Sequence, residues 1–263
     1  MNTKGINRLR SLKKQGEKIA SLTAYDASFA RLLDNAGIDM LLVGDSLGMV
    51  IQGQSSTIPV TMEAMKYHTQ AVCRNLSDKL IISDMPFMSY HTTELALNNA
   101  AQLMQQGASM VKLEGGQHLT EIIQRLSIQG IPVCAHLGLL PQSVYKLGGY
   151  TVQGRSTEEA LRIKNDALTL QQAGADILIL ECIPAQLAKE ITQSLDIPVI
   201  GIGAGTECDG QILVLYDILN LSPHQPRFSQ NFMTNGRDIT GAIEAYISAV
   251  KSATFPAAEH IFS

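Results

Sequence analysis

Short apolar runs alternate with longer amphipathic segments along nearly the whole chain. Eight runs rich in Val, Ile and Leu predict buried β-strands, at residues 18–25, 39–45, 79–87, 109–115, 131–138, 175–182, 197–205 and 210–219. Apolar residues at helical spacing predict helices between most of these strands, at residues 28–37, 61–76, 92–107, 119–130, 157–174 and 185–195. The seventh connection, around "TECDG", is too short for a full helix. Ile6, Leu9 and Leu12 predict one more helix before the first strand.

Eight apolar strands separated by helices favour a (β/α)8 TIM barrel with an N-terminal helix, and residues 1–263 are expected to form a single domain. The alternative is an open, doubly wound sheet, which a glycine-rich GxGxxG turn after the first strand would favour. "LTAYDASFA" (22–30) contains no glycine there. The glycine run "GIGAG" (201–205) follows the seventh strand instead, where a phosphate site and a tight turn explain it equally well.

Composition is typical of a globular protein, with 45% hydrophobic and 17% charged residues. A net charge of -4 offers no basic field to a nucleic acid, and the chain lacks an apolar stretch long enough to span a membrane. The four cysteines form no CxxC pair, which is typical of buried thiols and predicts a cytoplasmic location. The N-terminal segment is basic, and we expect its cations to form the solvated face of the first helix: Lys4, Arg8, Arg10, Lys13, Lys14 and Lys18.

Acidic residues stand at the predicted ends of several strands, which in a barrel share one face and carry the chemistry. Such clustered carboxylates would repel one another unless a cation lay among them, and oxygen ligands alone favour Mg²⁺. The acids at the predicted strand ends are Asp26, Asp45, Asp84, Glu114 and Glu181. Asp45 and Asp84 are followed by segments predicted to be loops. Asp26 is expected to be only the N-cap of the helix that begins beside it.

The stretch "VKLEGG" (111–116) narrows the chemistry, because Lys112 and Glu114 point to the same side of one strand. They could form an ion pair that stabilises the barrel, or Lys112 could face an anionic substrate while Glu114 reaches the metal directly or through water. Glu181 ends a very apolar strand, where a general base is expected. A metal, a cation and a separate base together indicate deprotonation of a carbon next to a carbonyl.

Nine segments in this order closely resemble the 3-methyl-2-oxobutanoate hydroxymethyltransferase family, also called ketopantoate hydroxymethyltransferase, over about residues 3–250. They are "TAYD" (23–26), "LVGDSLGMV" (42–50), "PVTMEAMKYH" (59–68), "DMPFMSY" (84–90), "VKLEGG" (111–116), "IPVCAHLGLLPQSV" (131–144), "GGYTVQGR" (148–155), "LECIPAQLAKEIT" (180–192) and "IPVIGIGAGTECDGQILV" (197–214). The resemblance implies a cytoplasmic barrel, often a homodecamer, acting in the pathway to pantothenate and coenzyme A. The implied reaction transfers a hydroxymethyl group from 5,10-methylenetetrahydrofolate to 3-methyl-2-oxobutanoate and gives 2-dehydropantoate.

The resemblance also implies roles for individual residues. Asp45 and Asp84 would hold Mg²⁺ and through it the 2-oxo acid, and Glu114 would complete the acidic surround of the ion. Ser46 and Lys112 would bind the carboxylate end of the substrate, and Glu181 would remove the proton from C3. His136 is expected to line the pocket with no assigned step, and Gly48 to turn the chain away from the mouth. No charge cluster marks a folate site.

Three other functions are compatible with parts of this pattern. A different metal-dependent 2-oxo acid lyase or aldolase could use a similar barrel, but lyases of the isocitrate lyase type usually carry a cysteine-bearing "KKCGH"-like loop that this sequence lacks. A Schiff-base aldolase could use Lys112 as its nucleophile. A barrel that has lost its chemistry would not be expected to keep all five charged residues: Asp45, Asp84, Lys112, Glu114 and Glu181.

Overall fold

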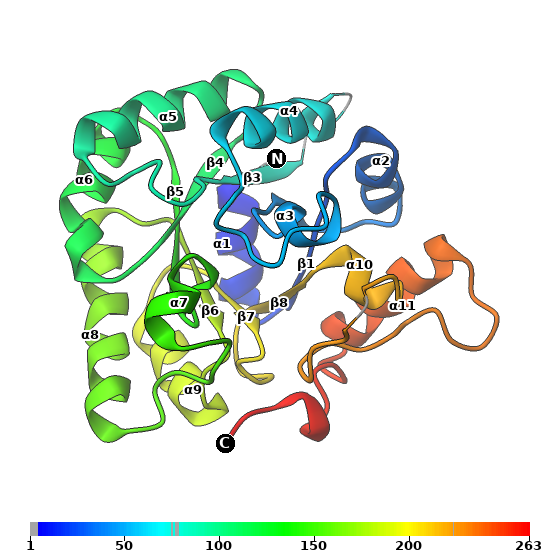
Figure 1. Cartoon of the computed structure of the whole chain (residues 1–263). Helices are drawn as coiled ribbons and strands as arrows, with labels where there is room; N and C mark the ends of the chain where they lie inside the picture. Colours follow the sequence, from blue (N-terminus) through cyan, green and yellow to red (C-terminus); the bar gives the residue numbers. More distant parts are fainter. Residues whose placement is uncertain (1–4, 75, 77–78, 223) are drawn as a thin grey trace.

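The chain folds into a closed barrel of parallel strands in chain order, as the computed structural model shows (Figure 1). The structure describes residues 5–74, 76, 79–222 and 224–263. The expected (β/α)8 barrel is confirmed. Its strands are β1 (Ile19–Thr23), β2 (Met40–Val43), β3 (Leu80–Asp84), β4 (Met110–Glu114), β5 (Val133–Gly138), β6 (Ile177–Glu181), β7 (Val199–Ile202) and β8 (Gly210–Leu213). The register closes where Ile19 lies beside Gly210.

Long helices surround the barrel, with their apolar faces buried against the strands (Figure 1). They are α2 (Ala27–Asn35), α4 (Met62–Cys73), α5 (Thr93–Gln105), α6 (Thr120–Ile128), α8 (Thr157–Ala173), α9 (Ala185–Ser194) and α11 (Ile239–Lys251). Shorter turns of helix lie in the connections: α3 (Leu47–Val50), α7 (Val144–Leu147), α10 (Leu215–Ile218), η1 (Gln117–Leu119), η2 (Pro141–Ser143) and η3 (Ala258–His260). In the part of the chain that is described, no helix is long and apolar enough to cross a membrane.

The predicted helices are all present, with small changes at their ends. The helix expected over 61–76 ends at Cys73, and residue 75 lies outside the described residues. Asp26 caps α2 as expected, because its carboxylate accepts hydrogen bonds from the backbone N–H groups of Ser28 and Phe29. No helix interrupts the short seventh connection, residues 203–209. The sequence analysis had not anticipated α11, which follows the last strand after a long irregular segment.

The predicted eighth strand, 210–219, is wrong in its second half. The strand ends at Leu213, opposite Leu22, and the chain turns into α10. The N–H of Leu215 donates to the side-chain oxygen of Thr23 at 3.0 Å rather than to the backbone of a neighbouring strand. Leu215 and Ile218 are still buried, so their apolar character fits a buried helix as well as a strand.

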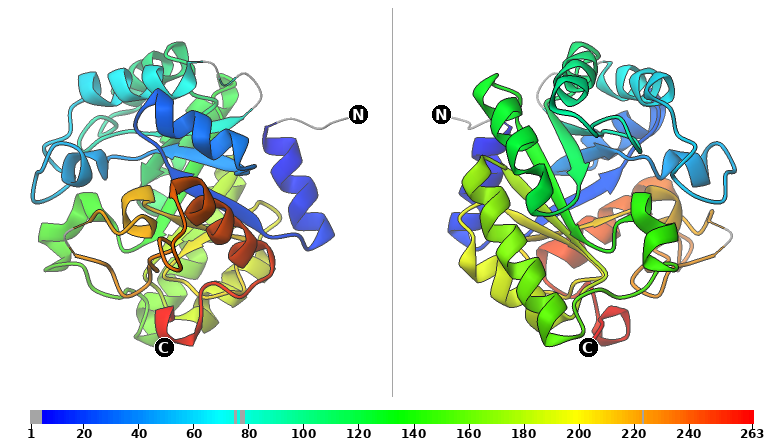
Figure 2. Two further views of the ribbon diagram at one scale, coloured as in Figure 1. Left: turned by 90° about the vertical axis from the view of Figure 1, so that its right-hand side faces the viewer. Right: turned by 60° about the vertical axis from the view of Figure 1, so that its left-hand side comes forward.

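Helix α1 (Ile6–Gln15) closes the amino end of the barrel, opposite the end where α3 and α7 lie (Figure 2). Leu9 and Leu12 are buried in one cluster with side chains from the barrel interior. The interior members are Ile19, Met40, Leu42, Leu80, Ile82, Met110, Cys134, Ile177, Ile179, Ile200 and Ile212. The helix therefore keeps water out of the interior at this end, which leaves the other end for chemistry.

The basic face of α1 is only partly the solvated surface that the sequence predicted. Three of its cations pair with aspartates that immediately precede strands: Arg8 with Asp39, Arg10 with Asp176 and Lys13 with Asp209. Each aspartate also accepts a hydrogen bond from a strand backbone N–H, at Ala20, Val133 and Val199 respectively. Lys14 is exposed, and the side chains of Arg8 and Arg10 remain 43% exposed beside their ion pairs. Lys18 lies beyond the end of the helix and donates to the carbonyls of Thr206 and Cys208, while Lys4 lies outside the described residues. The aspartates are distant in sequence, so local periodicity could not reveal these pairs.

Leu9→Ala tests the role of α1 in closing the barrel. Leu9 is 1% exposed, and its truncation should lower the free energy of unfolding by about 2–5 kcal/mol because a cavity is left in the packed interior. Chemical denaturation monitored by circular dichroism would measure the change. Leu161→Ala on α8 is the matched control, because Leu161 is 58% exposed and should shift stability by no more than about 0.5 kcal/mol. Equal effects of the two substitutions would contradict the assignment.

Candidate active site

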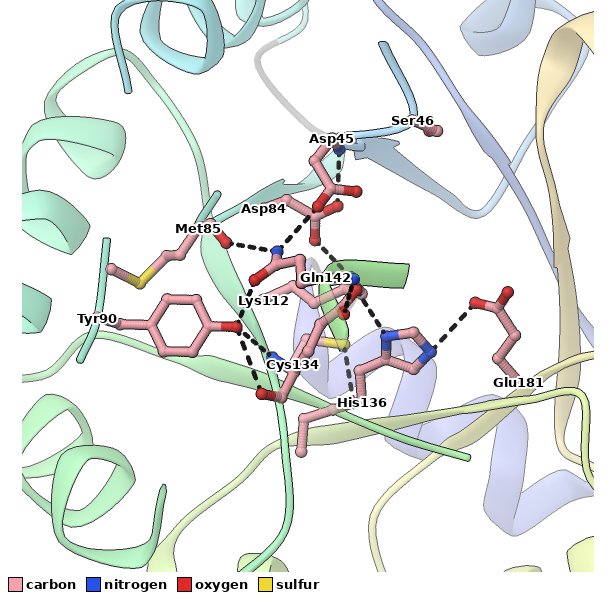
Figure 3. A network of polar contacts seen from close by, with 12 residues as sticks. Asp45, Ser46, Asp84, Met85, Tyr90, Lys112, Cys134, His136, Gln142 and Glu181 are labelled. Carbon is pink, nitrogen blue, oxygen red and sulfur yellow. Dashed lines mark hydrogen bonds and ion pairs between the residues drawn. The ribbon is translucent and has the colours of Figure 1, made fainter. Parts of the chain in front are cut away.

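The carboxyl end of the barrel brings together the charged residues predicted at the strand ends (Figure 3). Asp45 follows β2, Asp84 ends β3, and Lys112 and Glu114 lie on β4, while His136 lies on β5. All five side chains are buried. The parallel register explains the meeting, since Asp84 lies beside Lys112 and Glu114 beside His136.

Lys112 is the central cation of the site. Its Nζ lies 2.7 Å from Asp84 Oδ1 and 3.3 Å from Glu114 Oε1. Burial by itself would lower the pKa of Lys112, but the negative charges of Asp84, Glu114 and Asp45 outweigh burial and raise its pKa well above the usual value. Lys112 is therefore a firmly charged ammonium, which is a poor nucleophile toward a carbonyl. The predicted contact with Glu114 exists, and Asp84 is the nearer partner.

Both oxygens of Glu114 have protein donors. Oε1 contacts Lys112 and accepts from His136 Nδ1 at 3.2 Å, while Oε2 accepts from the backbone N–H of Gln142 at 3.1 Å. Burial alone would raise the pKa of Glu114, but the charge of Lys112 and the contact with His136 outweigh it and lower the pKa to about 2. The carboxylate is therefore ionised, and both of its oxygens already contact donors of the protein. It contributes negative charge to the site through Lys112 and His136.

Among the described residues, Asp84, Glu114 and Glu181 each pair with Lys112 or His136, whereas no cation pairs with Asp45. Burial and the charges of Asp84 and Glu114 raise the pKa of Asp45 well above its usual value. Its backbone N–H donates to Asp84 Oδ2 at 2.9 Å, so the two acidic residues are held side by side. Its Oδ2 accepts from Gln142 Nε2 at 2.8 Å, and no described residue donates to Oδ1. A positive ion beside Asp45 would stabilise the ionised form.

The donor set around Asp45 and Asp84 fits a hard cation that takes part of its coordination from elsewhere. Among the described residues, no group of three or more His, Cys, Asp or Glu side chains is arranged to hold a metal. Two carboxylates with remaining positions left to substrate and water are typical of Mg²⁺, and oxygen ligands do not favour softer ions. The oxygens of Asp45 and Asp84 are therefore suited to a hard cation such as Mg²⁺, and Glu114 is linked to Asp84 through Lys112 as a further carboxylate of the site.

His136 lies between two carboxylates. Nδ1 is 3.2 Å from Glu114 Oε1, and Nε2 is 3.2 Å from Glu181 Oε2 at the end of β6, although the second contact is not aligned as a hydrogen bond. Burial and the charge of Lys112 lower the pKa of His136, but the two carboxylates outweigh them and raise it to about 9. The imidazolium pairs with Glu181, whose side chain is 14% exposed and lies apart from Asp45 (Figure 3).

Ser46 stands beside Asp45 at the start of α3, with its side chain directed away from the carboxylates (Figure 3). Its hydroxyl is 2.8 Å from that of Tyr25. Residues 47–50 form the short helix α3, so the prediction of a loop directly after Asp45 is wrong. Gly48 lies inside α3, and a Cβ there would come within 2.6 Å of a methyl group of Val60. Close packing therefore requires glycine at this position. The prediction that Gly48 turns the chain away from the mouth of the barrel is wrong.

The glycine run 201–205 turns the chain after β7. Gly203 and Gly205 have φ values of 61° and 83°, in the left-handed region that favours glycine. A Cβ at Gly201 would lie 3.0 Å from Cys208 Sγ. Backbone geometry therefore accounts for these glycines without a phosphate.

Two residues that sequence reasoning missed, Gln142 and Tyr90, lie at the centre of the network (Figure 3). Gln142 Nε2 donates to Asp45 Oδ2 at 2.8 Å and to the carbonyl of Met85 at 3.0 Å. The hydroxyl of Tyr90 donates to Gln142 Oε1 at 2.6 Å. Neither residue ends a strand or carries a charge. The available signal was their place in the family segments "DMPFMSY" (84–90) and "IPVCAHLGLLPQSV" (131–144).

Solved structures with the same architecture show how widely the fold is shared. A phosphoenolpyruvate phosphomutase from Streptomyces platensis superposes with a TM-score of 0.63 at 14% identity, covering 82% of this chain and 83% of that one. A phosphonopyruvate hydrolase solved with oxalate and Mg²⁺ gives a TM-score of 0.61 at 12% identity, covering 80% of each chain. At these identities the likeness establishes the fold alone.

Sequence comparison is far more specific. A family model for ketopantoate hydroxymethyltransferase matches residues 3–258. The 3-methyl-2-oxobutanoate hydroxymethyltransferase of Nitrosococcus oceani is 60% identical, and that of Shewanella loihica 57%, each over 256 residues covering 97% of both chains. The chain therefore belongs to the ketopantoate hydroxymethyltransferase family and is an enzyme with the 3-methyl-2-oxobutanoate hydroxymethyltransferase activity of its relatives.

Proposed function

We propose that the enzyme transfers the one-carbon unit of 5,10-methylenetetrahydrofolate to C3 of 3-methyl-2-oxobutanoate and so forms 2-dehydropantoate for pantothenate and coenzyme A biosynthesis. The observation that carries this proposal is that two kinds of acid occupy separate places in one buried site. Asp45 and Asp84 lie together and fit a divalent cation, whereas Glu181 stands apart, held by His136. An electrophilic position and a separate base are what removal of a proton next to a carbonyl requires.

The metal half of the site would be Asp45 and Asp84, with Mg²⁺ as the ion that their oxygens favour. When bound, the ion would polarise the keto group and offset negative charge that develops on its oxygen. Glu114 supports this half indirectly, because its charge is already engaged by Lys112 and His136. Fixing these carboxylates in advance lowers the reorganisation that the reaction needs.

The substrate half of the site would use Lys112 and Ser46 for the carboxylate of the 2-oxo acid and Glu181 for C3. The ammonium of Lys112 attracts a carboxylate. The hydroxyl of Ser46 would donate to that carboxylate after turning from Tyr25 toward the site. Glu181 Oε2 would take the C3 proton while His136 holds the carboxylate in place. Carbon C3 then forms a bond to the methylene carbon of the donor, and water supplies the hydroxyl group on that carbon. Both C–N bonds of the methylene bridge break, N5 and N10 take up the proton from C3 and the remaining proton of water, and tetrahydrofolate leaves. Buried surroundings protect the carbanionic substrate from reprotonation.

The enzyme would act in the cytoplasm as a homo-oligomer. All four cysteines are free, which supports a reducing compartment and hence the cytoplasm. The family resemblance supports a homo-oligomer, with a homodecamer as the proposed form, and small molecules rather than nucleic acids as partners. The whole chain would act as a single domain.

Exchange of the C3 hydrogen of 3-methyl-2-oxobutanoate in D₂O isolates proton removal from folate chemistry. With Mg²⁺ and no folate, we expect exchange that EDTA abolishes and that Glu181→Gln slows by about 10²- to 10⁴-fold, because a positioned base is lost. Proton NMR would follow the signal. Glu190→Gln on α9 is the control, since Glu190 pairs with Lys164 on the outer helices and should exchange normally. Exchange that neither EDTA nor the Glu181 substitution alters would sink the mechanism.

The folate donor is tested by the second half of the reaction. Mass spectrometry should detect 2-dehydropantoate when 5,10-methylenetetrahydrofolate is supplied and none when 5-methyltetrahydrofolate replaces it, because the latter's methyl carbon is not electrophilic. C3 exchange should continue in both cases. Product formed without the methylene donor would contradict the proposed donor while leaving the proton-removal step intact.

Borohydride trapping separates this mechanism from a Schiff-base aldolase. Incubation with 3-methyl-2-oxobutanoate and borohydride should leave Lys112 unmodified, because two carboxylates keep it charged. Peptide mass spectrometry would report any adduct. A reduced substrate adduct on Lys112 would establish the alternative in place of the metal-assisted route.

A further inference from the structure

Asp45 is oriented by a neutral side chain, that of Gln142 in η2, rather than by a cation. Gln142 is 6% exposed and comes from the connection after β5, whereas Asp45 follows β2, so the contact crosses the mouth of the barrel. Its Nε2 donates to Asp45 Oδ2 at 2.8 Å (Figure 3). The bond occupies one carboxylate oxygen and leaves Oδ1 without a described donor.

The amide of Gln142 has only one orientation that satisfies its neighbours. The two hydrogens of Nε2 point to two acceptors, the carboxylate of Asp45 and the carbonyl of Met85. Oε1 accepts from the hydroxyl of Tyr90 at 2.6 Å. A reversed amide would set its oxygen against a carboxylate and a carbonyl, which is repulsive in a buried place.

Tyr90 fixes that orientation from the far side. Its hydroxyl accepts from the backbone N–H of Glu114 at 3.3 Å. Its hydrogen has two acceptors in reach, Gln142 Oε1 at 2.6 Å and the carbonyl of Glu114 at 3.3 Å, and the closer one is Gln142. Tyr90 is itself buried. The backbone N–H of Gln142 is also anchored, on Glu114 Oε2 at 3.1 Å. Gln142 thus makes four hydrogen bonds. Three of them fix its own position, and the fourth, to Oδ2, limits the rotation of the Asp45 side chain.

We propose that Gln142, locked by Tyr90, is a positioning residue that holds Asp45 Oδ2 and reserves Oδ1 for a divalent cation. The inference rests on the proposed use of a metal at Asp45 and Asp84. Groups that orient a ligand in this way typically change metal affinity by about 10- to 100-fold when they are lost. A buried glutamine that does not donate to Asp45, such as Gln211, should not affect the affinity for the metal ion.

Binding of Mn²⁺ alone, followed by the electron paramagnetic resonance signal of the free ion, tests this role without substrate or turnover. Gln142→Met keeps a similar volume but cannot donate to Asp45, so affinity should fall by about 10- to 100-fold. Tyr90→Phe removes only the hydroxyl that locks the amide and should cost about fivefold. C3 exchange by the Gln142→Met enzyme should recover as Mn²⁺ approaches saturation, which a general folding defect would not allow.

Gln211→Met is the matched control. Gln211 is also buried, and its Nε2 donates to the carbonyl of Gly205 at 2.9 Å, away from Asp45. Its Mn²⁺ affinity should equal that of the unmodified enzyme. An equal loss in the control would overturn the inference, as would unchanged affinity in both the Gln142 and Tyr90 variants. If Gln142→Met does not fold, Tyr90→Phe alone decides.

The inference and the proposed function fail in different ways. An unmodified enzyme that binds no Mn²⁺ would overturn the proposed metal use and the positioning role together. An unmodified enzyme that binds Mn²⁺, with variants that bind it equally well, would overturn only the role of Gln142 and Tyr90.

Discussion

Crowding of negative charge in a buried place governs the carboxyl end of this barrel. Two unit charges about 4 Å apart interact by roughly 4 kcal/mol at the effective dielectric of protein sites, so unpaired carboxylates cannot gather freely. Lys112 offsets Asp84 and Glu114, and His136 offsets Glu114 and Glu181. Asp45 accepts from the neutral amide of Gln142, and burial together with the charges of Asp84 and Glu114 raises its pKa. The proposed divalent cation would offset that uncompensated charge.

The barrel separates the parts that stabilise it from the parts that react. At the amino end, α1 buries Leu9 against the interior and pairs its cations with aspartates that also bond to strand backbones. At the carboxyl end, charged side chains are held by one another and by short connections such as η2. Rigid strands thus carry Asp84, Lys112 and Glu181 to fixed places, which lets a few hydrogen bonds set the geometry of the site.

Shared architecture and shared chemistry are different statements for this protein. The phosphomutase and hydrolase structures have the same fold at 12–14% identity, and a fold of this kind supports many reactions. The full-length relatives at 57–60% identity carry the activity. What distinguishes one such barrel from another lies in the residues at the strand ends and in the connections that orient them, of which Gln142 is an example.

The sequence by itself determined the strands, most helices and the placement of the acids at the strand ends. Strands buried on both sides read as continuous apolar runs, and Asp45, Asp84 and Glu181 interrupt those runs where the strands finish. The sequence did not distinguish a buried strand from a buried helix at Leu215, because one apolar pattern fits both. It also did not reveal the ion pair of Arg10 with Asp176, because the two residues are remote along the chain. Only the tertiary structure decided that Gln142 meets Asp45, 97 residues away, and that His136 bridges Glu114 and Glu181. The physical reason is that periodicity records burial, whereas hydrogen bonds across the mouth depend on how distant strands are brought together.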